Sequence, residues 1–188
     1  MALLLVTGGA GFIGSHTCLK LLEAGHDLIV LDDFSNSSPI ALDRVCEVSK
    51  RPIKLIRGDI RDQGSLEKIF TTAKEACQPI DAVIHFAGLK AVGESVANPL
   101  RYWNINVCGS RALLSAMDAH DCRTFVFSST STVYGEPNIF PLTETSSINP
   151  IHPYAQTKLA VEQMINSISK TGKWRFASLR YFLSLIHI

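Results

Sequence analysis

The sequence lacks the long apolar run that a membrane-spanning helix requires. Its first apolar stretch, Leu3–Val6, is too short for a span and has no basic flank of the kind that precedes a signal-peptide core. Charge of one sign is also not in excess, since the formal net charge is +1 and acidic and basic residues are intermixed. This balance disfavours nucleic acid and anionic membranes as partners. We therefore expect no membrane and no nucleic-acid partner.

Paired cysteines and clustered metal ligands are lacking as well. The five cysteines contain no CxxC pair, and the six histidines are dispersed along the chain. Zinc sites need Cys or His ligands at closer spacing, so we assign no metal. Scattered unpaired thiols are typical of reduced, buried cysteines, and we expect a cytoplasmic protein.

The sequence does contain a regular alternation of short apolar runs and helical stretches. The apolar runs predict six buried strands, at 3–6, 27–31, 53–56, 82–86, 125–127 and 174–182. Apolar spacing and helix-starting prolines predict helices at about 12–24, 65–76, 98–119 and 153–169. Alternating strand–helix–strand units predict an α/β fold with a doubly wound, parallel, Rossmann-type sheet. We expect one cofactor-binding domain over residues 1–182.

Three glycines follow the first predicted strand and open the first predicted helix. Gly8, Gly11 and Gly14 have the G-x-x-G-x-x-G spacing of a loop that binds a dinucleotide pyrophosphate. Such a loop needs a sharp turn, close approach of a phosphate to the backbone and tight helix–strand packing, and side chains would obstruct all three. The helix N-terminus adds free N–H groups and a positive dipole. The alternative is a tight turn that binds nothing.

An aspartate at the end of the second predicted strand supports dinucleotide binding. Asp32 lies 18 residues after Gly14, where a carboxylate accepts hydrogen bonds from the adenosine ribose. An acid there repels a 2′-phosphate, so we expect NAD rather than NADP as the cofactor. Asp59 and Ile60, after the third strand, are expected to border the adenine. The alternatives are a turn aspartate at Asp32 and a solvated loop acid at Asp59.

A tyrosine and a lysine lie one helical turn apart in the last predicted helix. Tyr154 and Lys158 share one helix face. An ammonium group near a phenol lowers the pKa of the phenol, and we expect Lys158 to make Tyr154 a base in this way. A Y-x-x-x-K pair alone is common by chance. Here it follows a strand that ends in Ser128–Thr130, whose hydroxyls can orient a substrate oxygen.

Together these segments resemble the extended short-chain dehydrogenase/reductase family of NAD-dependent epimerases and dehydratases, and within it the UDP-glucose 4-epimerases. The similarity covers residues 2–182 and is carried by 6–17, 31–37, 58–60, 85–95, 127–130, 133–135, 153–158 and 179–182. The segment Phe86–Ser95 is the most specific, because most other members of the superfamily keep only its Ala-Gly core.

The resemblance implies interconversion of UDP-glucose and UDP-galactose at C4, a step of galactose metabolism, with NAD regenerated in each cycle. Tyr154 would remove the 4-hydroxyl proton, hydride would pass to the nicotinamide, and it would return to the other face of the rotated 4-keto sugar. Lys158 would hold the nicotinamide ribose, and Thr130, Thr132 and Lys90 would contact the substrate. The residues that the resemblance assigns to the cofactor are Gly8, Gly11, Phe12, Ile13, Gly14, Asp32, Asp33, Asn36, Ser37, Asp59, Ile60, Phe86, Ala87, Gly88, Lys90, Asn106, Ser128, Tyr154, Lys158 and Phe182.

The chain departs from the family in two places. Thr130 stands where the family often has serine, and the retained hydroxyl predicts that activity survives. After Tyr181-Phe182 the family continues with Asn-Pro and a substrate domain, whereas this chain has a dissimilar tail over residues 183–188. We therefore expect the C-terminal substrate domain to be missing, the fragment to be poorly active, and a homodimer to form only in full-length members.

Three other functions are alternatives, and the sequence disfavours the first of them. A nucleotide-sugar 4,6-dehydratase needs an Asp-Glu pair beside the strand-end threonine, and this chain has Ser131-Thr132 there. A UDP-glucuronate epimerase or decarboxylase is compatible with the sequence, because sugar selection depends largely on the absent domain. A non-catalytic dinucleotide-binding module would not need Tyr154 and Lys158, so their presence favours an enzyme.

Overall fold

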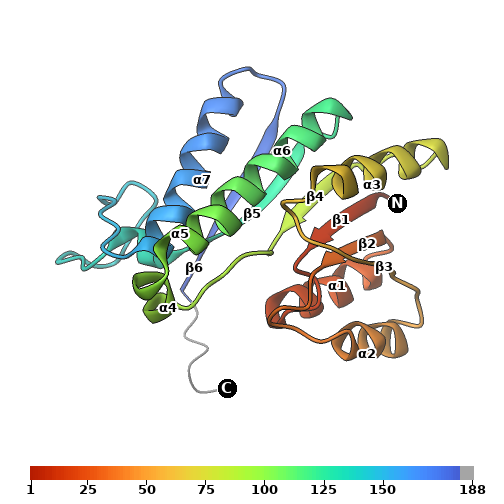
Figure 1. Cartoon of the computed structure of the whole chain (residues 1–188), viewed down its shortest axis with the longest axis horizontal. Coiled ribbons are helices and arrows are strands. Elements are labelled where there is room, and N and C mark those ends of the chain that lie inside the picture. The colour runs from red at the N-terminus through yellow and green to blue at the C-terminus, as the bar shows by residue number, and fades with distance from the viewer. Residues whose placement is uncertain (183–188) are drawn as a thin grey trace.

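The computed structural model describes residues 1–182, so the dissimilar tail at 183–188 lies outside the described residues. Its centre is a six-stranded parallel sheet in the order β3-β2-β1-β4-β5-β6, which confirms the predicted doubly wound fold (Figure 1). The strands are β1 (Leu3–Thr7), β2 (Asp27–Asp32), β3 (Lys54–Arg57), β4 (Ala82–His85), β5 (Thr124–Thr130) and β6 (Arg175–Tyr181).

The helices connect successive strands, as right-handed crossovers require. They are α1 (Phe12–Glu23), α2 (Ile40–Ser49), α3 (Gln63–Glu75), α4 (Val92–Ala97), α5 (Pro99–Tyr102), the π-helix η1 (Trp103–Cys108), α6 (Gly109–Ala119), the 3-10 turn η2 (Ser131–Tyr134) and α7 (Pro153–Ser169). The predicted helix at 98–119 is therefore α5, η1 and α6 in succession. Within residues 1–182, no helix has the length and apolar character needed to cross a bilayer.

Helix α2 was not predicted from the sequence. Of its ten residues only Leu42 and Val45 are buried, so its apolar pattern is weak. These two side chains belong to the smaller of two cores, which also holds Cys18 and Leu22 of α1, and α2 packs against α1. The helix thus depends on tertiary packing more than on its own apolar periodicity.

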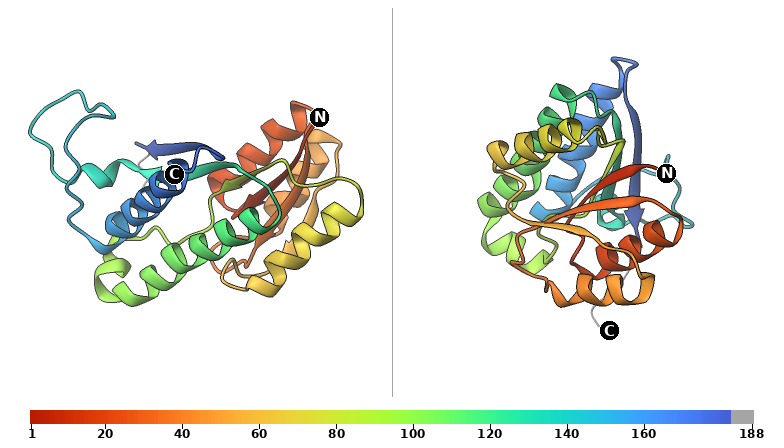
Figure 2. Two further views of the ribbon diagram at one scale, coloured as in Figure 1. Left: turned by 90° about the horizontal axis from the view of Figure 1, so that it is seen from above. Right: turned by 90° about the vertical axis from the view of Figure 1, so that its right-hand side faces the viewer.

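The sheet is covered by helices to different extents on its two faces. On one face, α3, α6 and α7 pack against side chains such as Leu5, Phe125 and Phe127 and form the larger core. On the other face, α1 and α2 cover β1 and β2. No described helix lies over β5 and β6 on this second face (Figure 2), where Leu179 is 41% exposed. Half of one sheet face is therefore open within residues 1–182.

Candidate active site

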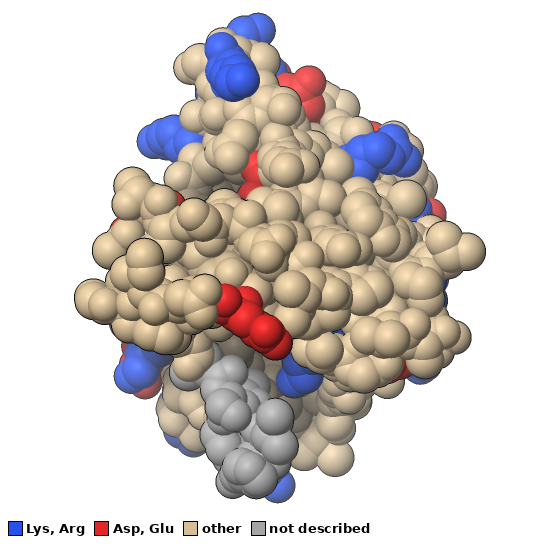
Figure 3. Space-filling view, turned by 90° about the vertical axis from the view of Figure 1, so that its left-hand side faces the viewer, with Lys and Arg blue, Asp and Glu red and all other residues tan. Residues whose placement is uncertain are grey.

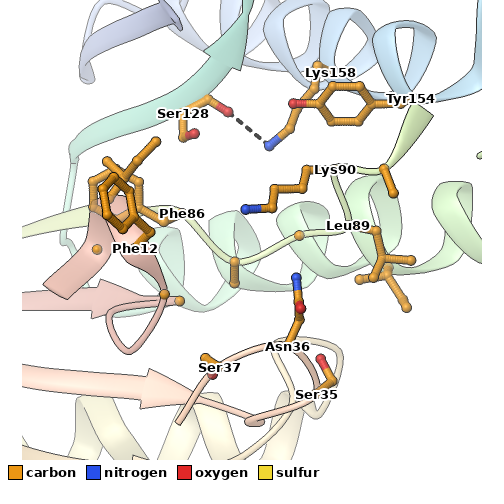
Figure 4. A pocket seen from close by; sticks show the side chains of 18 of the residues that line it. Phe12, Ser35, Asn36, Ser37, Phe86, Leu89, Lys90, Ser128, Tyr154 and Lys158 are labelled. Atoms are coloured by element: carbon orange, nitrogen blue, oxygen red, sulfur yellow. Dashed lines mark hydrogen bonds between the residues drawn. The ribbon is translucent and has the colours of Figure 1, made fainter. Parts of the chain in front are cut away.

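A cavity of about 760 Å³ lies at the carboxyl ends of the strands. The chain reverses its winding between β1 and β4, and doubly wound sheets bind ligands at such a point. In Figure 4, Lys90 extends into the space between Tyr154 and the loop that carries Asn36. The predicted residues that line the cavity are Gly8, Gly11, Phe12, Ile13, Gly14, Asp32, Asp33, Asn36, Ser37, Asp59, Ile60, Phe86, Ala87, Gly88, Lys90, Ser128, Thr130, Thr132, Tyr154 and Lys158.

The three loop glycines have different structural reasons. Gly8 has φ +70°, and a Cβ there would lie 2.5 Å from the backbone nitrogen of Ala87. A Cβ on Gly14 would lie 2.3 Å from the carbonyl oxygen of Gly8. A Cβ on Gly11 would meet only this same oxygen, at an ordinary 3.4 Å. Packing thus requires Gly8 and Gly14, whereas Gly11 keeps the entrance to α1 open on its cavity side.

The amino end of α1 faces the cavity without a side-chain cap. Gly11 is the N-cap residue, and no side chain accepts a bond from the first turn there. Phe12 and Ile13, the first residues of the helix, line the cavity. The first N–H groups of a helix have no partner within it, so this end can bind an anion.

Asp32 connects the glycine loop to the loop after β2. Its Oδ2 accepts a hydrogen bond from the Ala10 N–H at 2.9 Å. Its Oδ1 accepts from the Phe34 N–H at 3.0 Å and from the Ser37 hydroxyl at 2.7 Å. The carboxylate is buried but borders the cavity. A carboxylate has about four acceptor positions, so one remains for a ligand hydroxyl.

Asp59 forms an ion pair with Arg61 at the same end of the cavity. The closest oxygen–nitrogen distance is 2.5 Å, and the hydrogen bond with Arg61 lowers the pKa of Asp59. Asp59 therefore remains a carboxylate at neutral pH, and part of its acceptor capacity is already used by Arg61. This pairing was not predicted from the sequence.

Tyr154 and Lys158 lie on the first two turns of α7 and both line the cavity. The Lys158 ammonium donates to the Ser128 carbonyl at 2.9 Å and lies 4.9 Å from the centroid of the Phe127 ring (Figure 4). The Thr130 and Thr132 hydroxyl oxygens are 3.0 Å apart. The predicted phenol, ammonium and hydroxyl groups thus lie along one wall.

Burial decides the protonation of this pair. It raises the pKa of Tyr154, against the opposing effect of a hydrogen bond with Thr130. It also lowers the pKa of Lys158 to about 8. The expectation that Lys158 lowers the pKa of Tyr154 is therefore wrong for the polypeptide alone. Lys158 is not among the causes of the Tyr154 shift, since its ammonium group is directed at the Ser128 carbonyl and desolvation of the phenol dominates.

Asn106 lies behind the cavity wall. Its side-chain oxygen accepts from the Leu89 N–H at 2.8 Å, and its amide nitrogen donates to the Leu89 carbonyl and to the Thr157 hydroxyl. It projects from the π-helix η1, a feature that often marks functional sites. The hydrogen bonds of Asn106 thus connect the segment after β4 to α7.

Phe182 does not line the cavity. Its side chain is 64% exposed and stacks against Tyr134, whereas the neighbouring Tyr181 borders the cavity. The predicted closure of the nicotinamide end by Phe182 is not seen in this arrangement, because Phe182 follows the last residue of β6 and its ring packs on Tyr134 of η2. The cavity is also lined by Leu89, expected beside the cofactor, and by Ser129, expected among the hydroxyls that orient a substrate oxygen. The lining residues that were not predicted are Leu31, Ser35, Gly58, Ala91, Val92, Gly93, Ile105, Ser131 and Tyr181, most of which adjoin predicted ones.

Two buried polar networks support the wall and were missed. Nδ1 of His85 is hydrogen-bonded to the Thr7 hydroxyl at 2.6 Å, and its Nε2 is hydrogen-bonded to the Ser110 hydroxyl at 2.9 Å. Burial lowers the pKa of His85 to about 3. Glu162 of α7 accepts from the Ser129 hydroxyl and from the Arg180 guanidinium. The only sequence signal for either network was a polar residue within an apolar pattern.

Nearly the whole chain is similar to proteins of known sequence and structure. The chain is 46% identical over 180 residues to a UDP-glucose 4-epimerase of Bacillus subtilis, covering 95% of this chain and 52% of that relative. Two solved UDP-glucose 4-epimerases superpose closely. That of Bifidobacterium longum, in complex with NAD⁺ and UDP, gives a TM-score of 0.90 at 43% identity and covers 96% of this chain and 53% of its own.

The second structure, from Stenotrophomonas maltophila with bound NAD and formylated UDP-arabinopyranose, gives a TM-score of 0.91 at 41% identity. It matches 96% of this chain and 53% of its own length. The chain thus spans about half the length of these relatives. The family model for NAD dependent epimerases/dehydratases matches residues 4–184. The chain therefore belongs to the NAD dependent epimerase/dehydratase family.

Proposed function

We propose that the chain is the cofactor-binding and catalytic half of a UDP-glucose 4-epimerase, which interconverts UDP-glucose and UDP-galactose in galactose metabolism. One observation carries this proposal. A single cavity joins the glycine loop, the Asp32 carboxylate and the Tyr154–Lys158 pair. A dinucleotide site that served only for binding would not need a phenol and a buried ammonium group in its wall.

The residues of the cavity fit NAD. Its volume lies within the usual range of small-molecule sites, which is about 300–1,000 Å³. The open space beside Gly11 and the amino end of α1 suits a pyrophosphate, and Asp32 suits the adenosine ribose. Lys158 would hold the second ribose. When bound, NAD supplies an acceptor for hydride from C4 and returns it in the second half of the cycle.

The residues of the far wall fit the sugar. Tyr154 would take the proton of the 4-hydroxyl group, and Thr130, with Thr132 beside it, would hydrogen-bond the same oxygen. Thr130 already bonds the Tyr154 phenol, which lowers the pKa of that phenol in part. A hydroxyl group placed between the two would complete a short proton path.

The identity of the sugar is the finer part of the proposal. The relatives named above are UDP-glucose 4-epimerases, and one was solved with a UDP-arabinopyranose derivative. A related UDP-sugar epimerase or decarboxylase stays as the second candidate, because Tyr154 and Thr130 serve C4 oxidation in any such sugar. We also place the protein in the cytoplasm, in keeping with five cysteines that are all free thiols.

We propose a homodimer for the full-length protein. Large apolar side chains are exposed on neighbouring helices, with Val96 of α4 62% exposed, Leu100 of α5 82% and Trp103 of η1 38%. The molecular face at the left of Figure 1 also carries neutral side chains across most of its middle (Figure 3). Exposed apolar side chains on a weakly charged face are typical of an association surface.

The experiment that tests the proposed function is a chimera of residues 1–182 with the remaining part of the Bacillus subtilis relative. We expect it to convert UDP-galactose to UDP-glucose. Tyr154→Phe should abolish conversion and keep bound NAD, whereas Thr130→Ser should stay active and Thr130→Val should not. Conversion by the Tyr154→Phe chimera would show that the base is another group. The 188-residue chain alone should give little turnover, and robust turnover would contradict that expectation.

A further inference from the structure

The residue immediately before α7 is a histidine in the N-cap position. His152 has extended backbone angles, φ −133° and ψ 156°, and its side chain accepts a hydrogen bond from the Ala155 N–H. The distance from this N–H nitrogen to Nδ1 of His152 is 3.2 Å. The imidazole ring also stacks on the Tyr154 ring, with an interplanar angle of 2° and 6.0 Å between centroids. His152 therefore contacts both the backbone and the ring of the turn that carries the phenol.

A histidine cap differs from the usual Ser, Thr, Asp or Asn cap because it can lose its acceptor within the physiological pH range. Nδ1 accepts only in the neutral ring whose proton is on Nε2. The Ala155 N–H is in the first turn, where it has no partner within the helix. Ala155 is fully buried, so this N–H has little access to water once the cap is lost. A protonated ring would also place positive charge at the positive end of the helix dipole.

We propose that His152 is a pH-dependent positioning residue for Tyr154. The neutral ring caps α7 and holds the phenol against the cavity, and protonation of the ring releases the first turn. The inference rests on the proposed function only in treating Tyr154 as the reacting group. The cap itself is a property of the 188-residue chain.

The surroundings of His152 favour the neutral ring. Burial lowers its pKa below the ordinary value of 6.5, and a hydrogen bond that the ring donates to its own backbone opposes this in part. The titratable groups on elements packed against α7 are Glu94 of α4, Arg101 and Tyr102 of α5, Cys108 of η1, Tyr134 of η2, and Arg175, Arg180 and Tyr181 of β6, besides Tyr154, Lys158 and Glu162 of α7 itself. None of them is among the causes of the shift.

Most of these groups are already engaged with one another. Glu94 accepts from both Arg101 and the Tyr102 phenol, and Arg180 donates to Glu162 and to the Tyr134 phenol.

The lowered pKa of His152 sets the direction of the pH dependence. Because the folded-state pKa lies below the unfolded one, the stabilisation of α7 by the neutral cap is complete above about pH 6.5 and is lost as pH falls through the folded-state pKa.

The test uses hydrogen exchange of the Ala155 amide, followed by NMR against pH, in the 188-residue chain and in two variants. His152→Ser keeps a cap that does not titrate, and His152→Ala has none. Above pH 6.5 the Ala155 protection factor of the unchanged chain should equal that of His152→Ser. Below the pKa of His152 it should fall by about fivefold, the usual effect of losing one cap, to the level of His152→Ala.

The comparison with His152→Ser decides the matter even if His152→Ala fails to fold. Identical pH profiles of the Ala155 protection factor in the unchanged chain and in His152→Ser would overturn the proposal. A second readout is the ring chemical shift of Tyr154, which should titrate with His152 in the unchanged chain and not in His152→Ser. Neither measurement needs NAD or a sugar, so loss of the proposed epimerase function would leave both results interpretable.

Discussion

At the scale of single residues, the protonation of Tyr154 and Lys158 is the feature that most constrains the chemistry. Lys158 is buried with its ammonium group on the Ser128 carbonyl and the Phe127 ring. Burial raises the pKa of the Tyr154 phenol and lowers the pKa of Lys158 to about 8. The polypeptide alone therefore holds a neutral phenol at neutral pH, and a further positive charge is needed to favour phenolate.

The positively charged ring of oxidised nicotinamide is the charge that we expect to favour the Tyr154 phenolate. We expect NAD⁺ to lower the pKa of Tyr154 by about 1 pH unit or more, because an opposite charge nearby favours phenolate. NADH, whose nicotinamide ring is neutral, should have a smaller effect. The measurement is an ultraviolet difference titration of the chain, with the Tyr154→Phe variant subtracted to remove the other three tyrosines. Equal pKa values with NAD⁺ and NADH would contradict the proposed position of the nicotinamide.

At the scale of elements, the glycines in the turn from β1 to α1 have two different roles, one in packing and one in the proposed cofactor binding. A Cβ at position 14 would collide with the Gly8 carbonyl, whereas a Cβ at position 11 has room. Gly14→Ala should lower the free energy of unfolding by about 3 kcal/mol or more. Gly11→Ala should change it by no more than about 1 kcal/mol and weaken NAD binding. Urea denaturation and NAD titration of both variants check this, and normal NAD affinity in Gly11→Ala would argue against a pyrophosphate there.

A second element-scale feature is the ion pair that joins α7 to β6. Glu162 and Arg180 are 2.6 Å apart with side chains 6% and 19% exposed. Arg180→Met should destabilise the fold by about 3–5 kcal/mol, because it leaves a buried carboxylate unpaired. Urea denaturation measures the loss. Lys20→Met, which breaks the exposed pair with Glu23, is the matched control and should cost no more than about 0.5 kcal/mol. Equal effects of the two variants would be inconsistent with a structural role for Glu162–Arg180.

The elements also show which parts of the fold can be predicted from local sequence patterns. Strands such as β1 and β2 are continuous apolar runs that end in Gly8 or Asp32, and their type and order were predicted. The π-helix η1 was not predicted, since the hydrogen bonds around it include partners that are distant in the sequence. The Ser110 hydroxyl donates to the Asn106 carbonyl and lies 2.9 Å from His85 of β4. No local pattern encodes that partner.

The same limit applies within the candidate site. Spacing alone put Tyr154 and Lys158 on one helix face, and the structure places both at the cavity. Spacing did not reveal that the Lys158 ammonium turns to the Ser128 carbonyl, or that Tyr181 rather than Phe182 borders the cavity. Side-chain direction depends on what is buried around it, and one sequence does not contain that information in a local form.

At the scale of the whole molecule, the two halves of the sheet differ in cover. Strands β1 and β2, which precede the glycine loop and Asp32, are covered by helices on both faces, whereas β5 and β6 are covered on one face within residues 1–182. Ala177 and Leu179 of β6 are exposed on the open face. The glycine loop and Asp32 thus follow well-covered strands, and we expect NAD binding to require less of the relatives' length than sugar binding does.

The central claim is that the cavity binds NAD, and calorimetric titration of the folded 188-residue chain with NAD⁺ tests it most directly. We predict saturable binding of one NAD⁺ per chain, weaker binding of NADP⁺, and a loss of affinity of about tenfold or more in Asp32→Asn, because Asp32 bonds the ribose as a carboxylate. Asp43→Asn, at an exposed residue of α2 that does not line the cavity, is the control and should retain most of the affinity. A folded chain that binds no NAD⁺, or equal affinity in Asp32→Asn and the unchanged chain, would contradict the account.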